Sequence, residues 1–233
     1  MLDFRRFDVV SFDCYGTLIN WERGILDALR ATRENANRTL SDREVLEAYA
    51  MLEQRLETGH YMPYRLVLRG VMRELVQLLE VPAPRADFDA LADSLPRWRA
   101  FPDTVASLYR LKKHCKLAII SNTDREFFAD TARTLDVRFD WVITAEDVGS
   151  YKPSHKNFEH ALATMGIPKE RVLHAAQSRF HDIAPAHALG IANVWVNRRT
   201  GVDGEGATMP SLAVPDFEVP DLKTLADLVE ARA

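Results

Sequence analysis

Apolar positions along the chain follow two different patterns. Short apolar runs predict buried strands, and these runs occupy residues 9–12, 116–120, 141–144, 171–176 and 192–196. Between them, apolar residues at helical spacing predict helices over 104–111, 126–135, 157–165, 183–189 and 222–231. Strands that alternate with helices are typical of a parallel sheet covered on both faces. The predicted fold class is therefore α/β, with a Rossmann-like three-layer core.

The stretch between the first two predicted strands has no strand pattern. Four helical patterns lie there instead, over 22–33, from 41 to near 59, over 65–79 and over 87–97. Ser41 and Glu44 have the spacing of a capping box, which begins a helix. Four successive helices are unusual for a crossover between two parallel strands, so we expect an inserted helical cap. We place the cap at residues 20–99 and the core at residues 1–19 and 100–233.

Composition and charge exclude several classes of partner. The net charge is −4 and the isoelectric point about 6.0, which does not predict a nucleic-acid surface. No apolar run approaches the length of a membrane span, and the N-terminus lacks the apolar stretch of a signal peptide. The two cysteines, Cys14 and Cys115, have no metal-ligand or CxxC spacing. We therefore expect a cytoplasmic protein that binds neither nucleic acid nor membrane.

Polar groups stand at or beyond the ends of four predicted strands. Asp13 follows the first strand, Ser121 and Asn122 end the second, Lys152 follows the third, and Asp182 follows the fourth. The carboxyl ends of parallel strands meet at one edge of the sheet, where such folds bind ligands. We therefore expect these side chains to converge on one site.

The expected site has the groups required for covalent catalysis by a carboxylate. Asp13 is the predicted nucleophile. Lys152 is expected to lower the pKa of Asp13 by its opposite charge. Thr17 and Ser121 are expected to donate hydrogen bonds to the Asp13 carboxylate. Asp182 is expected either to hold Lys152 or to orient a water molecule against a covalent ester.

Four motifs resemble those of the haloacid dehalogenase superfamily. The first is D-x-x-G-T-L, represented by Asp13-Cys14-Tyr15-Gly16-Thr17-Leu18. Ser121-Asn122 resembles the second motif, Lys152 in Tyr151-Lys152-Pro153 the third, and Asp182 the fourth. The match in order and spacing covers nearly the whole chain. It implies that the helical insertion is the C1-type cap of this superfamily.

Tyr15 distinguishes two branches of the superfamily. Phosphatase members have a second aspartate at this position as general acid and base, and they hold Mg²⁺ with acidic residues of the fourth motif. A tyrosine phenol has an ordinary pKa of about 10 and is a poor acid near neutrality. The form D-x-Y-G-T-L is similar to type II (L-)2-haloacid dehalogenases, which are metal-independent. The resemblance therefore implies no metal site and no cofactor.

The resemblance also implies a mechanism on a small 2-substituted carboxylic acid. Asp13 attacks the carbon that bears the leaving group, and water near Asp182 and Lys152 hydrolyses the aspartyl ester. The product is a 2-hydroxy acid of inverted configuration. Asn122 is similar to the residue near the departing halide. Thr17 and Ser121 are similar to residues that bind the nucleophile and the substrate carboxylate. The catalytic residues that the resemblance implies are therefore Asp13, Thr17, Ser121, Lys152 and Asp182.

The cap residue that contacts the leaving group is the least determined part of the site. Dehalogenases use an arginine of the second cap helix, and Leu52 stands at the corresponding position of this chain. Arg55 and Arg65 are the candidates to replace it. Tyr15, Trp21 and Ser178 are further candidates for substrate contact, whereas His181 could touch Asp182 or lie on the surface.

Several functions remain open at this point. The main interpretation is a 2-haloacid dehalogenase that cleaves a carbon–halide bond. An azetidine-2-carboxylate-type hydrolase, which opens a ring C–N bond, needs no halide-binding arginine. A Mg²⁺-dependent phosphatase and a catalytically silent binding protein of the same fold are two further candidates. The resemblance is compatible with a homodimer, because relatives are commonly homodimers.

Overall fold

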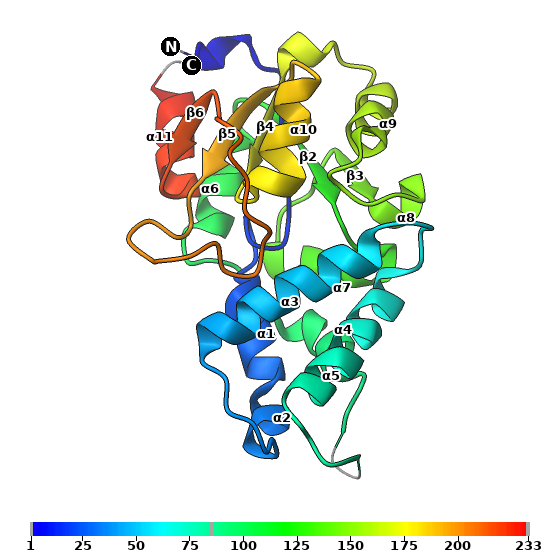
Figure 1. Cartoon of the computed structure of the whole chain (residues 1–233). Coiled ribbons are helices and arrows are strands. Elements are labelled where there is room, and N and C mark those ends of the chain that lie inside the picture. The colour runs from blue at the N-terminus through cyan, green and yellow to red at the C-terminus, as the bar shows by residue number, and fades with distance from the viewer. Residues whose placement is uncertain (1, 84–85, 232–233) are drawn as a thin grey trace.

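The core of the protein is one parallel β-sheet. A computed structural model describes residues 2–83 and 86–231, so the predicted bounds at residues 1 and 233 lie outside it (Figure 1). Within these residues, six strands form the sheet in the order β3-β2-β1-β4-β5-β6. In that order they are Trp141–Thr144, Lys116–Ser121, Val9–Phe12, Val172–Ala176, Ala192–Val196 and Phe217–Val219. All neighbouring strands are parallel, which confirms the predicted α/β fold class.

Alternating side chains of the strands bury the two faces of the sheet against different helices. Val9 and Ile120 pack in a cluster with residues of α9 (His155–Met165) and α10 (Ala184–Ala188). Their neighbours Val10 and Ile119 belong instead to the larger cluster that contains residues of α6 (Thr104–Leu111), α7 (Arg125–Leu135) and α11 (Leu222–Glu230). Successive residues of a strand point to opposite faces, so continuous apolar runs are needed to cover both.

The cap helices lie beyond the carboxyl ends of the strands (Figure 1). They are α1 (Trp21–Ala28), α2 (Arg30–Glu34), α3 (Asp42–Glu57), α4 (Tyr64–Leu78) and α5 (Ala90–Ser94). The predicted capping box begins α3: the Glu44 amide donates to Ser41 Oγ at 3.3 Å, and the Ser41 amide donates to Glu44 Oε2 at 2.8 Å. No helix in the described part of the chain is long and apolar enough to cross a membrane.

Some predicted elements differ in the structure. The helix predicted over 22–33 is divided at Leu29 into α1 and α2. The helix predicted over 87–97 is shorter, because α5 passes into a 3₁₀ turn at Leu95–Arg97 that contains Pro96, which has no amide proton to donate. The helix predicted over 183–189 is preceded by a π-helical turn, Arg179–Ile183. Strand β6 was not predicted, since only three residues form it.

Two adjacent connections join the cap to the core. The Asn20 amide donates to the Arg99 carbonyl at 2.8 Å, and the Phe101 amide donates to the Leu18 carbonyl at 3.0 Å. The entering and leaving segments are therefore held side by side. We accordingly retain residues 20–99 as the proposed extent of the cap.

A carboxylate of the core also holds the cap. Asp124 Oδ1 accepts a hydrogen bond from the Tyr64 amide at 2.8 Å, and its Oδ2 accepts one from the Arg65 amide at 3.0 Å. These are free amides of the first turn of α4, where a negative charge is favourable.

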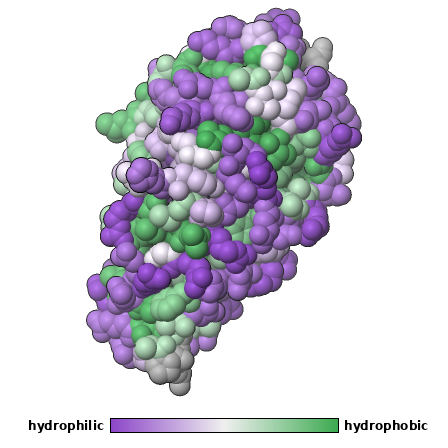
Figure 2. All heavy atoms as spheres, turned by 90° about the vertical axis from the view of Figure 1, so that its right-hand side faces the viewer, coloured by the Kyte–Doolittle hydropathy of each residue, from purple (hydrophilic) through white to green (hydrophobic). Residues whose placement is uncertain are grey.

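On the face shown in Figure 2, hydrophilic side chains predominate and hydrophobic ones lie in patches between them.

Candidate active site

Asp13 follows β1 and begins a tight loop. Its Oδ2 atom accepts a hydrogen bond from Thr17 Oγ1 at 2.8 Å, as predicted. Gly16 has a φ of +96°, and a Cβ atom there would lie 3.0 Å from the Trp21 indole nitrogen and 3.2 Å from Gln177 Oε1. The turn thus requires glycine, because a side chain would be strained and would displace two residues of the site.

Lys152 joins the two aspartates at the sheet edge. Its ammonium group donates to Asp13 Oδ1 at 3.0 Å, to Asp182 Oδ1 at 2.6 Å and to the Ile120 carbonyl at 2.7 Å. The lysine side chain is 1% exposed, and these contacts use all three of its protons. The structure therefore brings together the polar groups that follow strands β1, β3 and β4, and the ammonium is fixed by them.

Asp182 is held from a second side by a histidine. His174 Nε2 lies 3.0 Å from Asp182 Oδ1, and His174 Nδ1 lies 3.0 Å from Ser11 Oγ. The other oxygen, Asp182 Oδ2, is buried and has no hydrogen-bond partner among the described residues. An oriented carboxylate with one unpaired oxygen can accept a proton from a water molecule.

The Ser121 hydroxyl does not make its predicted contact. Ser121 Oγ is buried and has no hydrogen-bond partner in the described part of the chain, so it does not donate to Asp13. That prediction was wrong: Lys152 and Thr17 donate to the two Asp13 oxygens, and Ser121 does not. Ser121 lines the same cavity as Asp13, which leaves its hydroxyl available to a bound molecule.

The pKa values of the two aspartates, Asp13 and Asp182, shift in opposite directions. Burial raises the pKa of Asp13 above its ordinary value, although the Lys152 charge and the Thr17 hydrogen bond oppose this rise. Burial also acts to raise the pKa of Asp182, but Lys152 and His174 outweigh it and leave that pKa lowered. The effect of Lys152 on Asp13 has the predicted sign, yet the net shift is upward because desolvation dominates.

A small cavity of about 30 Å³ lies between the sheet edge and the cap. It is lined by Asp13, Tyr15, Trp21, Glu53, Glu57, Tyr64, Ser121, Asn122, Lys152, Gln177, Ser178, His181 and Asp182. A neighbouring cavity of about 390 Å³ shares Glu57 and Lys152 with it. The candidates Tyr15, Trp21, Asn122 and Ser178 therefore lie where the sequence predicted them.

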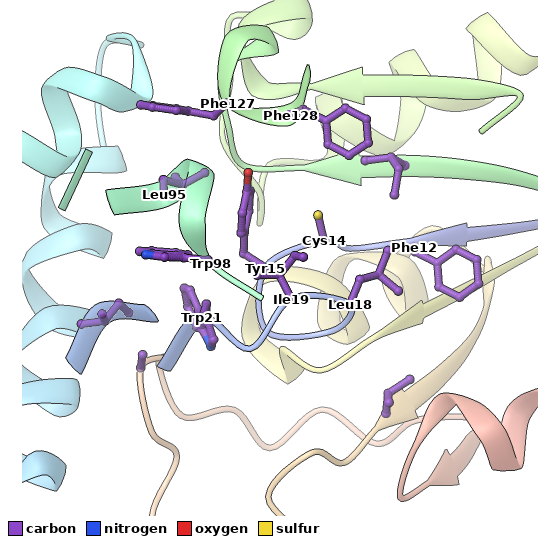
Figure 3. Close-up of a cluster of buried hydrophobic side chains, with 14 of the residues drawn as sticks. Phe12, Cys14, Tyr15, Leu18, Ile19, Trp21, Leu95, Trp98, Phe127 and Phe128 are labelled. Carbon is purple, nitrogen blue, oxygen red and sulfur yellow. The ribbon is translucent and has the colours of Figure 1, made fainter. Parts of the chain in front are cut away.

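Two of these residues differ in detail from their predicted surroundings. The Tyr15 ring faces the cavity, but its hydroxyl lies 2.7 Å from Thr131 Oγ1 and belongs to the buried cluster of Figure 3. Burial raises the pKa of Tyr15 well above 10, so the phenol cannot act as an acid near neutrality. The side-chain amide of Asn122 binds the backbone of Lys152. Its Oδ1 atom accepts from the Lys152 N–H at 2.7 Å, and its Nδ2 atom donates to the Lys152 carbonyl at 3.0 Å, which fixes the loop that carries the lysine.

The predicted arginines do not reach the cavity. Arg55 is exposed and pairs with Glu74, and Arg65 pairs with Asp93 at 3.0 Å and is also partly exposed. Arg55 lies midway between two inward-facing positions of α3, so the helical rotation directs it outward. Leu52 packs against the hydrophobic core instead. Among the described lining residues there is no arginine.

Helix α3 contributes two carboxyl groups to the cavity in place of an arginine. Glu53 Oε1 accepts hydrogen bonds from the hydroxyls of Tyr49 and Tyr64, each at 2.6 Å. Glu57 Oε2 accepts one from Asn122 Nδ2 at 3.1 Å. Burial raises the pKa of Glu53 to about 7 and that of Glu57 well above its ordinary value. These residues were missed because acidic residues on a helix usually face solvent.

His181 and Gln177 complete the lining and were also not predicted as site residues. His181 is buried, so the surface alternative was wrong, and its Nε2 atom lies 3.1 Å from Gln54 Oε1 of the cap. Burial lowers the pKa of His181 to about 4, which keeps the imidazole neutral at pH 7. The backbone N–H of Gln177 donates to Thr17 Oγ1 at 2.9 Å and thereby orients the hydroxyl toward Asp13.

The chain is similar in sequence to known dehalogenases. The chain is 24% identical to haloacetate dehalogenase H-2 of Moraxella sp. (strain B), over 97% of this chain and 99% of that protein. It is 27% identical to (S)-2-haloacid dehalogenase H-109 of Pseudomonas putida, over 94% of this chain and 96% of that protein.

A solved structure shares the fold. It is the L-2-haloacid dehalogenase from Xanthobacter autotrophicus with chloropropionic acid covalently bound, with a TM-score of 0.78 at 20% identity over 97% of this chain and 100% of that one. Residues 7–190 match the haloacid dehalogenase-like hydrolase family, which confirms the resemblance of the motifs. The chain belongs to the haloacid dehalogenase-like hydrolases.

Proposed function

We propose that the protein is a hydrolase that forms an aspartyl ester through Asp13 with a small 2-substituted carboxylic acid. Carbon–halide hydrolysis of a 2-haloacid is the main candidate reaction, because the relatives described above are named for it. The observation that carries the proposal is the buried Asp13, whose two oxygens are oriented by Thr17 and Lys152 at a small cavity. We further propose that it works in the cytoplasm without a metal or cofactor.

The first step is a displacement at carbon. An oxygen of the Asp13 carboxylate forms a bond to C2 of the substrate while the bond from C2 to the halide breaks, and the halide leaves with the electron pair. Thr17 and Lys152 hold the carboxylate in one orientation, which lowers the entropic cost of aligning its oxygen with C2 of the substrate. Attack from the side opposite the halide inverts the configuration at C2.

The second step is hydrolysis of the ester. Water attacks the Asp13 carboxyl carbon and passes a proton to the unpaired Oδ2 atom of Asp182. The Lys152 ammonium stabilises the negative charge that develops on the Asp13 oxygen. The ester C–O bond at that carbon then breaks, Asp182 returns the proton to the leaving oxygen, and the 2-hydroxy acid leaves with an oxygen that came from Asp13. The carboxyl group of Asp13 loses its remaining proton to solvent.

Isotope transfer from ¹⁸O-water tests this sequence of steps with 2-chloropropionate as substrate. Repeated turnover is expected to place ¹⁸O in the Asp13 carboxylate, whereas a single turnover yields 2-hydroxypropionate with an unlabelled hydroxyl. Mass spectrometry of the peptide and of the product measures both. A labelled hydroxyl in a single turnover, with none in Asp13, would show direct attack by water and contradict the proposal. The Asp13→Asn variant is the control and should give no product.

A ring-opening hydrolase of the azetidine-2-carboxylate type is the second candidate. It is favoured by one observation: the described lining residues include two cap glutamates and no arginine. Azetidine-2-carboxylate in place of 2-chloropropionate in the same isotope experiment distinguishes the two reactions.

A magnesium-dependent phosphatase is a weaker candidate, because the residues do not fit the ion. Tyr15 replaces the second aspartate, and its hydroxyl is bound by Thr131. The Lys152 ammonium already occupies the space between Asp13 and Asp182. We expect no turnover of p-nitrophenyl phosphate with Mg²⁺, and turnover that EDTA abolishes would favour the phosphatase over the proposed function.

A further inference from the structure

The cavity contains more acidic than basic groups. Four carboxyl groups line it, from Asp13, Glu53, Glu57 and Asp182. Lys152 is the one lysine or arginine among the described lining residues, and its ammonium is already shared by Asp13 and Asp182. The cap wall of the cavity therefore has no cation of its own.

The two cap carboxyl groups are bound by neutral donors. Glu53 accepts from tyrosine hydroxyls, and Glu57 accepts from the Asn122 amide. His181 Nε2 lies 4.0 Å from Glu57 Oε2, in an imidazole that is neutral at pH 7. The Lys152 charge also acts on Glu57, but Lys152 forms its ion pairs with Asp13 and Asp182. Within the described residues, Glu53 Oε2 and Glu57 Oε1 have no hydrogen-bond partner.

Such an arrangement is costly in the empty protein. Burial of a carboxylate without an opposite charge is unfavourable, and both residues are at least nine-tenths buried. Their raised pKa values show this cost, since both carboxyl groups tend to keep their protons when the cavity is empty. A cationic ligand would reverse the balance by supplying the missing charge.

The spacing of the two residues suits one small cation. Positions four apart on a helix lie on the same face with their Cβ atoms about 6 Å apart. Glu53 and Glu57 therefore present two carboxyl groups side by side, opposite the nucleophile Asp13. A second buried and unpartnered group, the Ser121 hydroxyl, also lines the cavity and can accept or donate to a ligand.

We propose that the substrate of Asp13 carries a protonated nitrogen and that Glu53 and Glu57 bind this nitrogen from the cap side of the cavity. The inference rests on the proposed aspartyl-ester function and names its substrate class, a 2-substituted carboxylic acid that is also an ammonium ion. A simple 2-haloacid brings only a negative charge to four carboxyl groups, whereas a zwitterion brings the charge that the cap wall lacks.

Two substrates meet this description: in one the nitrogen takes no part in the reaction, and in the other it is the leaving group. In both, the cap glutamates bind the protonated nitrogen. In the first, Asp13 displaces a halide from C2 and the ammonium remains on the product. In the second, Asp13 opens a cyclic amine: its oxygen bonds to C2, the C2–N bond breaks, and the nitrogen, protonated when bound, leaves as the neutral amine. Water then hydrolyses the ester as before, and the amine takes up a proton from solvent or a cap glutamate.

A matched pair of substrates tests the proposal. We would compare 4-amino-2-chlorobutanoate with 2-chloropentanoate, in which a methyl group replaces the ammonium. The expected result is a kcat/KM at least about 30-fold higher for the amino compound, the effect of about 2 kcal/mol for one charged contact. Azetidine-2-carboxylate is the arm for the leaving nitrogen, because its hydrolysis gives the same product, 4-amino-2-hydroxybutanoate.

Variants of the cap then assign the preference to its residues. Glu53→Gln and Glu57→Gln keep the side-chain shape and should each reduce the ratio of the two kcat/KM values at least about fivefold. Glu47→Gln is the matched control, because Glu47 lies on the same helix, is exposed and pairs with Arg43 at 2.7 Å. A ratio near one in the native enzyme, or one that the cap variants leave unchanged, overturns the proposal.

Binding and isotope measurements separate this inference from the proposed function. Calorimetric titration should show tighter binding of 4-amino-2-hydroxybutanoate than of 2-hydroxypentanoate, and equal affinities contradict the inference without any need for turnover. If 2-chloropentanoate labels Asp13 with ¹⁸O as efficiently as the amino compound, the aspartyl-ester function stands and the ammonium class is wrong. If neither compound labels Asp13, and azetidine-2-carboxylate and 2-chloropropionate do not label it either, the proposed function fails and this inference with it.

Discussion

The two walls of the cavity handle buried charge in opposite ways. On the core wall, Asp13 and Asp182 share the ammonium of Lys152 at 3.0 Å and 2.6 Å. On the cap wall, Glu53 and Glu57 share only neutral donors. The core wall thus has its own cation, whereas the cap wall has none. We therefore propose that the core wall performs the chemistry and that the cap wall selects the substrate.

Removal of the nucleophile should have the largest effect on this comparison. Asp13→Asn retains the shape of the side chain but loses the attacking oxygen anion, so kcat should fall by about 10⁴-fold or more. The circular dichroism spectrum and the thermal midpoint show whether the fold persists. Residual activity within tenfold of the native enzyme would mean that Asp13 is not the nucleophile.

Removal of Lys152, the cation that Asp13 and Asp182 share, should have the second largest effect. Lys152→Met leaves the Asp13 and Asp182 carboxylates buried without a cation, and the free energy of unfolding should fall by about 3–5 kcal/mol. Urea denaturation at pH 7 measures this loss. The double variant Lys152→Met with Asp182→Asn should recover part of it, because one of the unpaired charges is gone. Additive losses in the double variant would contradict the shared-charge account.

Neutralisation of the cap wall should stabilise the empty protein at high pH. Burial raises the pKa of Glu53 from 4.5 to about 7, so between these values the folded chain holds a proton that the unfolded chain releases. Stability from this group is therefore present at low pH and is lost as the pH rises through about 7. Glu53→Gln should add about 3 kcal/mol at pH 8.5 and almost nothing at pH 4.

Denaturation curves of the native protein and Glu53→Gln at several pH values measure this difference. Glu47→Gln, on the same helix, is the matched control, because the Glu47 side chain lies outside the cavity and pairs with Arg43. Equal gains at both ends of the pH range would indicate a packing effect rather than the titration of Glu53. A fall in stability at high pH would contradict the account of the cap wall.

The contact between cap and core should give the smallest effect. Asp124→Ala removes the two hydrogen bonds to the first amides of α4, at 2.8 Å and 3.0 Å, and should cost about 1 kcal/mol of stability. KM should rise more than kcat falls, because the cap wall of the cavity is held less firmly against the core while Asp13 and Lys152 are unchanged. Glu126→Ala removes only an exposed pair with the Arg65 side chain at 3.4 Å and should change stability by less than about 0.5 kcal/mol. Equal effects of the two substitutions would remove Asp124 from this role.

Much of the core could be predicted because its signals are local. The apolar runs predicted strands β1 to β5, and the capping box predicted the start of α3 at the residue where it occurs. Convergence of Asp13, Lys152 and Asp182 followed from the rule that parallel strands end at one edge. Strand β6 escaped prediction, since three residues form too short a pattern to recognise.

The cap wall could not be predicted in the same way. Arg55 and Glu57 are two residues apart, and the sequence alone does not say which of them faces the core. Val45 and Tyr49 are buried on the face of α3 that continues through Glu53 and Glu57, so the acidic pair lies in line with apolar residues. That alignment is the signal that could have identified the pair, although it becomes decisive only when the position of the core is known.

The sequence by itself determined the α/β fold and the helical insertion and led to the proposal of Asp13 as the reactive carboxylate, because each depends on local periodicity or on motif residues at strand ends. The tertiary structure decided what surrounds that carboxylate. It turned Arg55 and Arg65 outward, left the Ser121 hydroxyl unpaired and placed Glu53 and Glu57 over Asp13. Those outcomes depend on how the cap helices pack over the sheet edge, which brings residues far apart in the sequence into one cavity.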